Sequence, residues 1–391
     1  MKRKVKEPLR FDALKNNIKE LLRSDKLWIA VFKYGTSLAA VMILGGILIA
    51  AQGENVGNAL SAIWAGAFGN MNAFANTLRW TAPCILTGAA TIVAFKAGVM
   101  NLGIEGQLCF GALAAALIGA FWELPPFLHI TLCILVAGIV GMLYAIIPAI
   151  LRLFFKINEF VTTLMFNFIA VLLTEYIVQI IIRGGLEAGW GFTNANATPT
   201  ILSTAVLPKI IPETTATLAF PISICIALLI AFLYKFTIQG YELKQVGESI
   251  KFAKTGGVRV VRTFLAIFLL SGFISGLAGG IEIIGTYKKF NVGFSANMGW
   301  DGVSIARIAE LNPVALIFVS FVWAALRAGS LQMERVTSMN RLTVNIIQMV
   351  FVLFVSINYE KIYMSMKDKR RLKREQKERT LKEMEAVAHV G

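Results

Sequence analysis

The chain has 391 residues, of which 57% are hydrophobic and only 16% charged, with a formal net charge of +15 and a mean hydropathy of +0.68. A soluble domain normally carries about 25% charged and about 45–50% apolar residues. Here the apolar excess forms blocks of about 17–25 residues, the length that crosses a hydrocarbon core of about 30 Å. The composition excludes an ordinary soluble domain and a coiled coil, and it predicts an all-α polytopic membrane protein.

Basic residues gather beside the apolar blocks, in residues 1–26, 236–262 and 358–391. Lys and Arg near the ends of membrane helices hold those ends on the cytoplasmic side. We therefore expect a cytoplasmic basic N-terminal segment over residues 1–26, a transmembrane domain over 27–357 and a cytoplasmic basic C-terminal tail over 358–391. Because the charge follows the spans, no nucleic-acid partner is expected.

Side chains that could bind metal are few and widely spaced. The four cysteines lie in or near apolar blocks without Cys-x-x-Cys spacing, at Cys84, Cys109, Cys133 and Cys225. The two histidines, His129 and His389, are far apart. Buried thiols behave as small hydrophobic groups, so neither a disulfide framework nor a metal site is expected. No cleavable signal peptide is expected either, since no short apolar core ends in a small-residue cleavage site.

Apolar runs of membrane-spanning length follow one another along the chain. In chain order they cover about residues 27–51, 73–95, 106–121, 127–150, 160–182, 218–236, 264–284, 303–309, 314–328 and 344–357. A polar stretch over residues 52–72 separates the first two, and the longest exterior loop covers residues 183–217. Both ends of the chain carry basic residues, so the number of crossings must be even, and we expect about ten.

A six-residue pattern occurs twice, about half a chain apart. Asn-x-Gly-x-acid-Gly is found at residues 101–106 and again at residues 297–302, where the acids are Glu105 and Asp301. Internal repeats with glycine-interrupted segments in corresponding positions point to a transport site near the membrane midplane. The repeat predicts duplicated halves with some helices short or broken, and it makes Asp301 a candidate pathway residue.

The stretch from Lys96 to Gln107 interrupts apolar sequence with glycines, amides and a carboxylate. Non-helical backbone at membrane depth persists only where protein or a water-filled cavity satisfies its polar groups. Ionisable residues there suggest function, so Asn101, Glu105 and Gln107 are candidate pathway residues. An equally simple interpretation is an interfacial turn in which Asn101 caps the next helix.

A second polar cluster opens the fifth run, from Asn158 to Asn167. Thr163 and Asn167 are four residues apart and share a helix face. Glu159, close to the helix start, complements the helix dipole. Asn158, Thr163 and Asn167 are therefore further pathway candidates. The alternatives are an ordinary capped helix start for Asn158 and an interhelical hydrogen bond for Asn167.

Catalytic motifs are missing from the sequence. It contains no Gly-x-x-x-x-Gly-Lys-[Ser/Thr] loop to hold ATP phosphates. It also lacks Gly-x-Ser-x-Gly and His-Glu-x-x-His. The chain is therefore not expected to be an enzyme or to bind a cofactor itself.

The polar motifs resemble those of bacterial nucleoside ABC importer permeases, within the broader family that handles simple sugars and branched-chain amino acids. The resemblance runs from about residue 78 to 357 in consistent order. The matching blocks are residues 95–107, 158–167, 240–247 with 253–258, 271–282 and 299–306, followed by Asn312-Pro313. Two places depart from the usual pattern: Arg307 and Glu310 are bulkier and more charged, and Thr255-Gly-Gly replaces Tyr-Ala-Gly.

The resemblance implies a permease subunit in the bacterial cytoplasmic membrane with both termini cytoplasmic, importing nucleosides by alternating access. It implies a second permease subunit as heterodimer partner, a cytoplasmic ABC ATPase that carries ATP and Mg, an extracytoplasmic substrate-binding lipoprotein, and surrounding membrane lipid. It also implies that the loop over residues 236–262 couples to the ATPase. The implied coupling residues are Gly240, Tyr241, Glu242, Gly247, Lys254 and Gly256.

Other functions stay open at this point. Ribose, another simple sugar or a branched-chain amino acid could replace the nucleoside. An ion-coupled secondary transporter would need intramembrane carboxylates, which Glu105, Glu159, Glu175, Glu282 and Asp301 could supply. A membrane enzyme acting on lipid is disfavoured because the usual catalytic groups are missing.

Overall fold

The computed structural model describes residues 35–36, 39–40, 43–182, 196–338, 342–355 and 357. The predicted terminal segments, 1–26 and 358–391, lie outside the described residues. Within the described part the chain is helical and forms no strand, apart from two isolated β-bridges in the loops. The prediction of an all-α fold is confirmed.

Seven helices in the described part are long and apolar enough to cross a membrane, which confirms a polytopic membrane protein. They are α4 Met71–Lys96, α5 Ile104–Phe121, α6 Pro126–Phe155, α7 Glu159–Tyr176, α9 Ala219–Phe236, α12 Val260–Glu282 and α14 Pro313–Val336. Helices α7 and α12 each continue for one π-helical turn, over Ile177–Ile182 and Ile283–Tyr287. Shorter helices are α3 Val56–Phe68, α10 Ile238–Glu248, α11 Ile250–Thr255, α13 Met298–Ile308 and α15 Leu342–Val355. The number of about ten crossings stays a prediction.

The sequence was misleading at two places. The stretch expected to be a polar connection, residues 52–72, contains helix α3, because Asn55 and Asn70 cap the starts of α3 and α4 rather than form a loop. Helix α14 also runs eight residues beyond the predicted end at residue 328, to Val336. Arg327 therefore lies inside a helix, where Asp301 neutralises its charge.

The chain divides into two compact units, one formed by residues 1–51 and 346–391 and the other by residues 52–345. In the smaller unit, Gly45 packs against the side chain of Ile347. The larger unit contains every helix from α3 to α14, and it holds all the predicted pathway and coupling residues.

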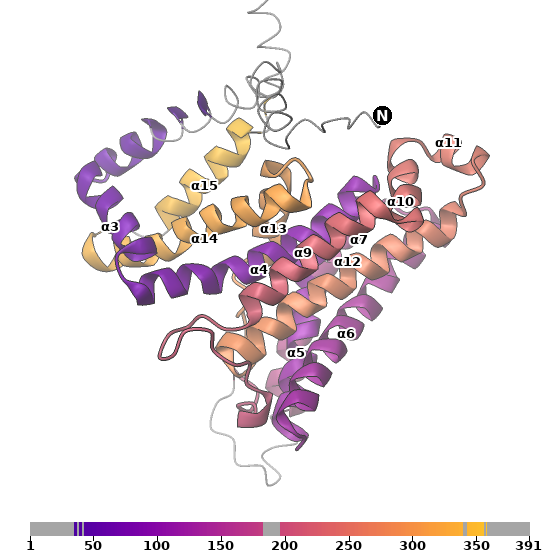
Figure 1. Ribbon diagram of the computed structural model, residues 1–391, viewed down its shortest axis with the longest axis horizontal. Helices are drawn as coiled ribbons and strands as arrows, with labels where there is room; N and C mark the ends of the chain where they lie inside the picture. The colour runs from indigo at the N-terminus through magenta and orange to yellow at the C-terminus, as the bar shows by residue number, and fades with distance from the viewer. Residues whose placement is uncertain are drawn as a thin grey trace, which may run out of the picture. The chain divides into compact units, whose positions relative to one another are not determined.

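Helix packing in the larger unit follows the sequence repeat (Figure 1). Helix α12 packs against α5 and α6, and in the corresponding way α4 packs against α13 and α14. Helices α4 and α12 also contact each other. Exchanging α4 with α12, α5 with α13 and α6 with α14 thus preserves the contacts that α4 and α12 make, as duplicated halves require.

Small residues bring the central helices close together. A Cβ on Gly276 of α12 would collide with the carbonyl oxygen of Ala137 in α6, and one on Gly279 would collide with that of Leu108 in α5. Such positions let membrane helices pack backbone against backbone. In contrast, the outer faces of α6, α7 and α9 expose large apolar side chains such as Phe154 and Leu229. These faces suit lipid or a partner subunit.

Candidate functional site

The turn between α4 and α5 is held by buried amides. The Asn101 side chain accepts a hydrogen bond from the Gly103 amide at 2.9 Å and donates one to the Ser271 hydroxyl of α12 at 2.9 Å. It also pairs with the Gln107 amide at 3.2 Å in both directions. Asn101 and Gln107 therefore fix the turn against α12 and use most of their hydrogen-bonding capacity in doing so.

The start of α5 is satisfied by side chains from α7. The Leu102 amide donates to the Thr163 hydroxyl at 3.1 Å, and the Gly106 amide donates to Asn167 Oδ1 at 2.9 Å. Asn167 Nδ2 in turn donates to the Leu102 carbonyl at 2.7 Å. The first N–H groups of a helix have no partner within it. Thr163 and Asn167, on one face of α7, supply partners and join the two helices.

Glu105 connects the two copies of the repeated pattern. Its Oε2 accepts a hydrogen bond from the Gly299 amide, at 2.6 Å, across 194 positions of the sequence. Gly299 lies in the first turn of α13, where a carboxylate stabilises the positive end of the helix dipole. A Cβ on Gly299 would lie 2.5 Å from the Glu105 backbone nitrogen, so this approach requires glycine.

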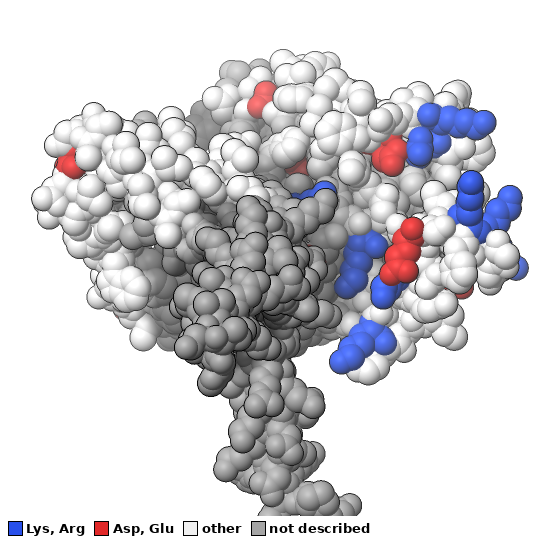
Figure 2. Space-filling view, turned by 90° about the horizontal axis from the view of Figure 1, so that it is seen from above, with Lys and Arg blue, Asp and Glu red and all other residues white. Residues whose placement is uncertain are grey.

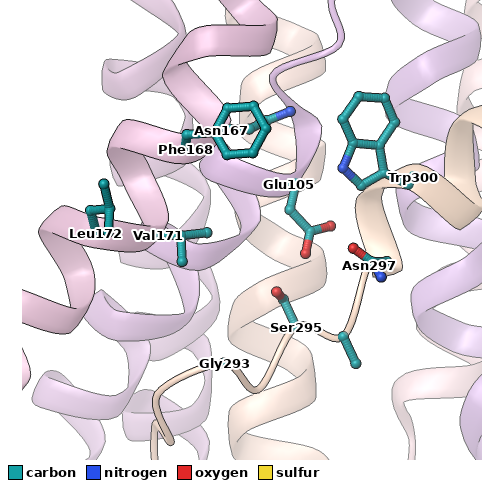
Figure 3. Close-up of a pocket in the computed structure, with 10 residues that line it drawn as sticks. Glu105, Asn167, Phe168, Val171, Leu172, Gly293, Ser295, Asn297 and Trp300 are labelled. Carbon is teal, nitrogen blue, oxygen red and sulfur yellow. The ribbon is translucent and has the colours of Figure 1, made fainter.

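A cavity of about 400 Å³ lies between α7, Glu105 and the loop that leads into α13 (Figure 3). Its polar lining consists of Glu105, Asn167, Ser295 and Asn297. The rest of the lining is apolar or glycine: Phe168, Val171, Leu172, Gly293, Ala296 and Trp300. Glu105, Asn167 and Ser295 are buried, whereas Phe168, Leu172 and Asn297 are exposed. The cavity thus extends from a polar interior to the surface of the larger unit.

Of the predicted pathway residues, Glu105 and Asn167 line the cavity, whereas Asn101, Gln107, Thr163, Asn158 and Asp301 lie outside its lining. Asp301 pairs with Arg327 of α14. Asn158 is exposed at the start of α7, where its side chain caps the helix by accepting from the Phe160 amide at 2.9 Å. Glu159 beside it pairs with Arg152 at 3.0 Å. The structure therefore gathers Asn101, Gln107, Thr163 and Asn167 around the start of α5, where Glu105 contacts α13. Asn158 is not part of this region, and Asp301 is paired with Arg327.

Comparison with known proteins places this arrangement in a family. Residues 73–355 match the family described as branched-chain amino acid transport system / permease component. The chain belongs to this family of ABC permeases. Subunits of this kind translocate solute and are not themselves enzymes. The family name gives the group and does not fix the solute of any one member.

Three relatives cover most of the permease. The guanosine ABC transporter permease protein NupP of Bacillus subtilis is 29% identical, over 81% of this chain and 90% of its own. The glucose ABC transporter permease protein TsgB13 of Haloferax volcanii is 28% identical over 85% and 89%. The nucleoside ABC transporter permease protein NupB of Lactococcus lactis is 24% identical over 74% and 80%. No solved structure matches the permease.

The predicted coupling loop of the permease forms helices α10 and α11. Helix α10 follows α9 so closely that a Cβ on Gly240 would collide with the Leu233 carbonyl. Thr237 caps α10 by accepting from the Gly240 amide at 3.0 Å. At the other end, a Cβ on Gly247 would lie 2.6 Å from the Lys96 carbonyl oxygen. Helix α10 is thereby packed against the end of α4 and the turn that leads to Asn101.

The two faces of α10 and α11 differ. Leu243 of α10 is buried in an apolar cluster with Ala94, Ala97 and Phe268. Of the predicted coupling residues on the outer face of this helix pair, Tyr241, Lys254 and Gly256 are exposed and Glu242 is half-buried. This face also exposes large apolar residues: Ile238, Ile250 and Phe252. Described basic side chains gather on the side of the molecule where these helices lie (Figure 2). A basic, partly apolar surface of this kind is typical of the cytoplasmic end of a membrane protein.

Sequence reasoning missed a buried ion pair in the permease. Arg79 of α4 donates to Glu282 of α12 at 2.7 Å, and both side chains are buried. The Arg79 and Arg327 guanidinium groups lie 3.7 and 4.0 Å from the centre of the Trp80 ring. The signal was available, because Arg79 is a charged residue inside an apolar run. Its partner, 203 positions away, could not be identified from the sequence.

Proposed function

We propose that this permease moves nucleosides into the cell as the membrane subunit of an ATP-driven importer. Two of the three reported relatives are named for guanosine or nucleoside transport. The observation that carries the mechanism is the turn over residues 97–103. On one side it contacts α10 through Gly98 and Gly247, and on the other it leads to Glu105 at the cavity.

The proposal includes four partners. A cytoplasmic ABC ATPase, carrying ATP and Mg, would bind the outer face of α10 and α11, where Ile238, Tyr241 and Phe252 are exposed. A second permease would cover the apolar outer face of α7, and an extracytoplasmic lipoprotein would deliver the solute. Lipid of the bacterial cytoplasmic membrane would surround the rest. Both termini would be cytoplasmic, on the same side as the basic end of the molecule.

Transport would follow from a push on α10. Closure of the ATPase moves α10 and, through Gly247, the turn that carries Asn101. Because Thr163 and Asn167 attach α7 to the start of α5, α7 moves with the turn. Its displacement from the start of α13 opens the cavity inward. The two arrangements need differ by only a few kcal/mol to exchange population, and about 5.5 kcal/mol converts a 1:99 mixture into 99:1.

Uptake of labelled guanosine tests the proposal. Cells that express the other importer subunits are compared with and without this chain. Uptake is measured in the presence of unlabelled nucleosides, ribose, glucose or leucine as competitors. We expect uptake that requires the chain, falls when ATP is depleted and is blocked only by nucleosides. Competition by glucose or ribose would favour the sugar alternative, for which the glucose permease relative is the supporting observation. Collapse by an uncoupler while ATP is maintained would favour an ion-coupled transporter instead.

A further inference from the structure

The loop that leads from α12 into α13 has a strained backbone where it lines the cavity. The consecutive residues Ala296 and Asn297 have φ values of +43° and +65°. This left-handed region is unfavourable for residues that carry a Cβ. Strain of this kind persists only where the surrounding structure holds the backbone in place, and it is concentrated at ligand clamps and switch regions. The groups that hold this loop therefore indicate what it does.

Glu105 of α5 is the first of these groups. Its carboxylate receives the Ser295 hydroxyl and the backbone amides of Asn297 and Gly299. Figure 3 shows the carboxylate pointing toward Ser295 and Asn297. A carboxylate offers about four lone-pair positions, so these donors use most of its capacity. Glu105 thus binds the strained loop and the start of α13 together.

Arg327 of α14 is the second group. It forms an ion pair with Asp301 in the first turn of α13 and donates a hydrogen bond to the Ala296 carbonyl at 3.2 Å. The guanidinium lies 4.0 Å from the centre of the Trp80 ring of α4. The strained backbone is therefore held by two charged side chains, one from α5 and one from α14.

The two contacts belong to parts of the permease that separate in the proposed mechanism. Thr163 and Asn167 join α5 to α7, so Glu105 moves with α7 when that helix leaves the start of α13. Helices α13 and α14 both pack against α4, so Arg327 stays with the loop. The movement therefore breaks the bonds of Glu105 and keeps those of Arg327.

We propose, resting on the proposed function, that residues 293–297 are the gate of the cavity and that Glu105 is its lock. In the closed state Glu105 keeps Ala296 and Asn297 in their strained conformation. When α5 moves away the gate relaxes, and Arg327 keeps it attached to α14. The strain favours opening, so the lock releases without a large input of energy.

Two buried cysteines report which of the two contacts has opened. Cys109 of α5 is hydrogen-bonded to Ser295, whereas Cys84 of α4 interacts with the charges of Asp301 and Arg327. Both thiols are almost fully buried, so a maleimide reaches each one only when its surroundings open. Purified permease–ATPase complex is labelled with N-ethylmaleimide. Mass spectrometry of the two cysteine peptides then gives the two rates separately.

Weakening the lock should expose Cys109 alone. In Glu105→Gln one acceptor oxygen becomes an N–H donor, so at least one donor of the loop loses its partner. We expect the Cys109 rate to rise by a factor of about 5–150, which corresponds to one unpaired buried group, and the Cys84 rate to stay the same. Glu175→Gln is the control, because Glu175 is another carboxylate whose charge acts on Cys109. An equal rise at both thiols, or an equal rise in the control, would overturn the role of Glu105.

Two substitutions test the strain without changing a charge. Ala296→Gly removes the penalty for a positive φ, so the closed gate is stabilised and the Cys109 rate should fall by a factor of about 5–30. Gly293 has a φ of +73°, and a Cβ there would have nothing within 4 Å. Gly293→Ala therefore strains the closed gate without a collision, and it should raise the rate by a similar factor. Unchanged rates, or shifts of the same sign, would show that the gate is not a strained element.

ATP connects the gate to transport. We expect ATP trapped on the ATPase with vanadate to raise the Cys109 rate and to leave the Cys84 rate unchanged. If cells take up nucleosides but trapped ATP leaves Cys109 protected, the gate is wrong while the importer function stands. If the wild-type chain supports no nucleoside uptake, the proposed function is wrong. The labelling needs no solute, so it still decides whether Glu105 locks the loop.

Discussion

Gly98 and Gly247 pack backbone against backbone, linking the turn after α4 to the end of α10. A Cβ on Gly98 would lie 2.9 Å from the Gly247 Cα, and Gly98 has a φ of +72°, which disfavours any other residue. Three residues further along the turn, Asn101 joins the hydrogen-bonded region at the start of α5. In the proposed mechanism, this contact carries the movement of α10 to the candidate site.

Enlarging Gly247 should separate ATP hydrolysis from transport. In Gly247→Val the new side chain would collide with the backbone of Lys96 and Ala97, so α10 can no longer pack against the turn. We expect guanosine uptake to fall at least tenfold while ATP hydrolysis by the purified complex continues. Lys244→Ala, an exposed change on the same helix, is the control and should retain uptake. Normal uptake in Gly247→Val would show that force does not pass through this contact.

Removing the α7 side chains that form hydrogen bonds with the start of α5 should destabilise the protein. A buried group left without its hydrogen-bond partner costs about 1–3 kcal/mol. Asn167→Ala leaves both the Gly106 amide and the Leu102 carbonyl unpaired, so it should lower the thermal unfolding temperature more than Thr163→Val does.

Thr131→Val provides the comparison for these two variants. The Thr131 hydroxyl is exposed and bonds only to the Phe127 carbonyl of its own helix, so little change is expected. Equal unfolding temperatures for all three variants, measured on purified protein in one detergent, would contradict the role given to Thr163 and Asn167.

Removing one partner of the buried pair Arg79–Glu282 should destabilise the protein, whereas replacing both partners with apolar residues should not. Removing one partner of such a pair costs about 3–5 kcal/mol, because the other charge stays buried and unpaired. Arg79→Met or Glu282→Leu alone should therefore destabilise the protein strongly, whereas the double variant should recover most of the loss.

An exposed ion pair on the same protein is the control for the loss of stability in these variants. Lys244 and Glu248, 3.6 Å apart on α10, are largely exposed, and exposed helix pairs contribute about 0.3–0.5 kcal/mol. Lys244→Ala should hardly change the unfolding temperature. A double Arg79→Met, Glu282→Leu variant no more stable than the single ones would show that the two side chains do not act as a pair.

The exposed apolar residues of α10 and α11 should be needed to bind the ATPase. Replacing Ile238 and Phe252 by serine removes apolar surface without disturbing the buried Leu243. We expect the ATPase to be lost when the permease is purified from detergent extracts. Lys251→Ser, a polar exposed change on α11, should retain it. Retention of the ATPase by the double serine variant would place the docking surface elsewhere.

Helix positions followed from the sequence wherever an apolar run ended at a clear break. Helices α4 and α9 lie within two residues of their predicted ends. Helix α3 was missed because Asn55, which caps it, and Asn70, which caps the next helix, are of the residue type that also forms loops. The first predicted span begins outside the described residues.

The candidate site could be only partly predicted. Asn101, Glu105 and Asn167 were identifiable because polar residues in apolar runs are rare. Phe168 and Trp300 were not, because an aromatic residue that faces a cavity looks in sequence like one that faces lipid. The hydrogen bond between Glu105 and Gly299 depends on how the two halves pack, and only the repeated pattern hinted at it.

In the proposed function, ATP hydrolysis on a partner drives nucleosides through this permease. Purified permease, ATPase and lipoprotein in proteoliposomes, with no ion gradient, test it most directly. We expect labelled guanosine to cross the membrane toward the ATPase side only when ATP is supplied there and this chain is present. Movement that needs an ion gradient instead of ATP, or no guanosine movement in a complex that hydrolyses ATP, would contradict it.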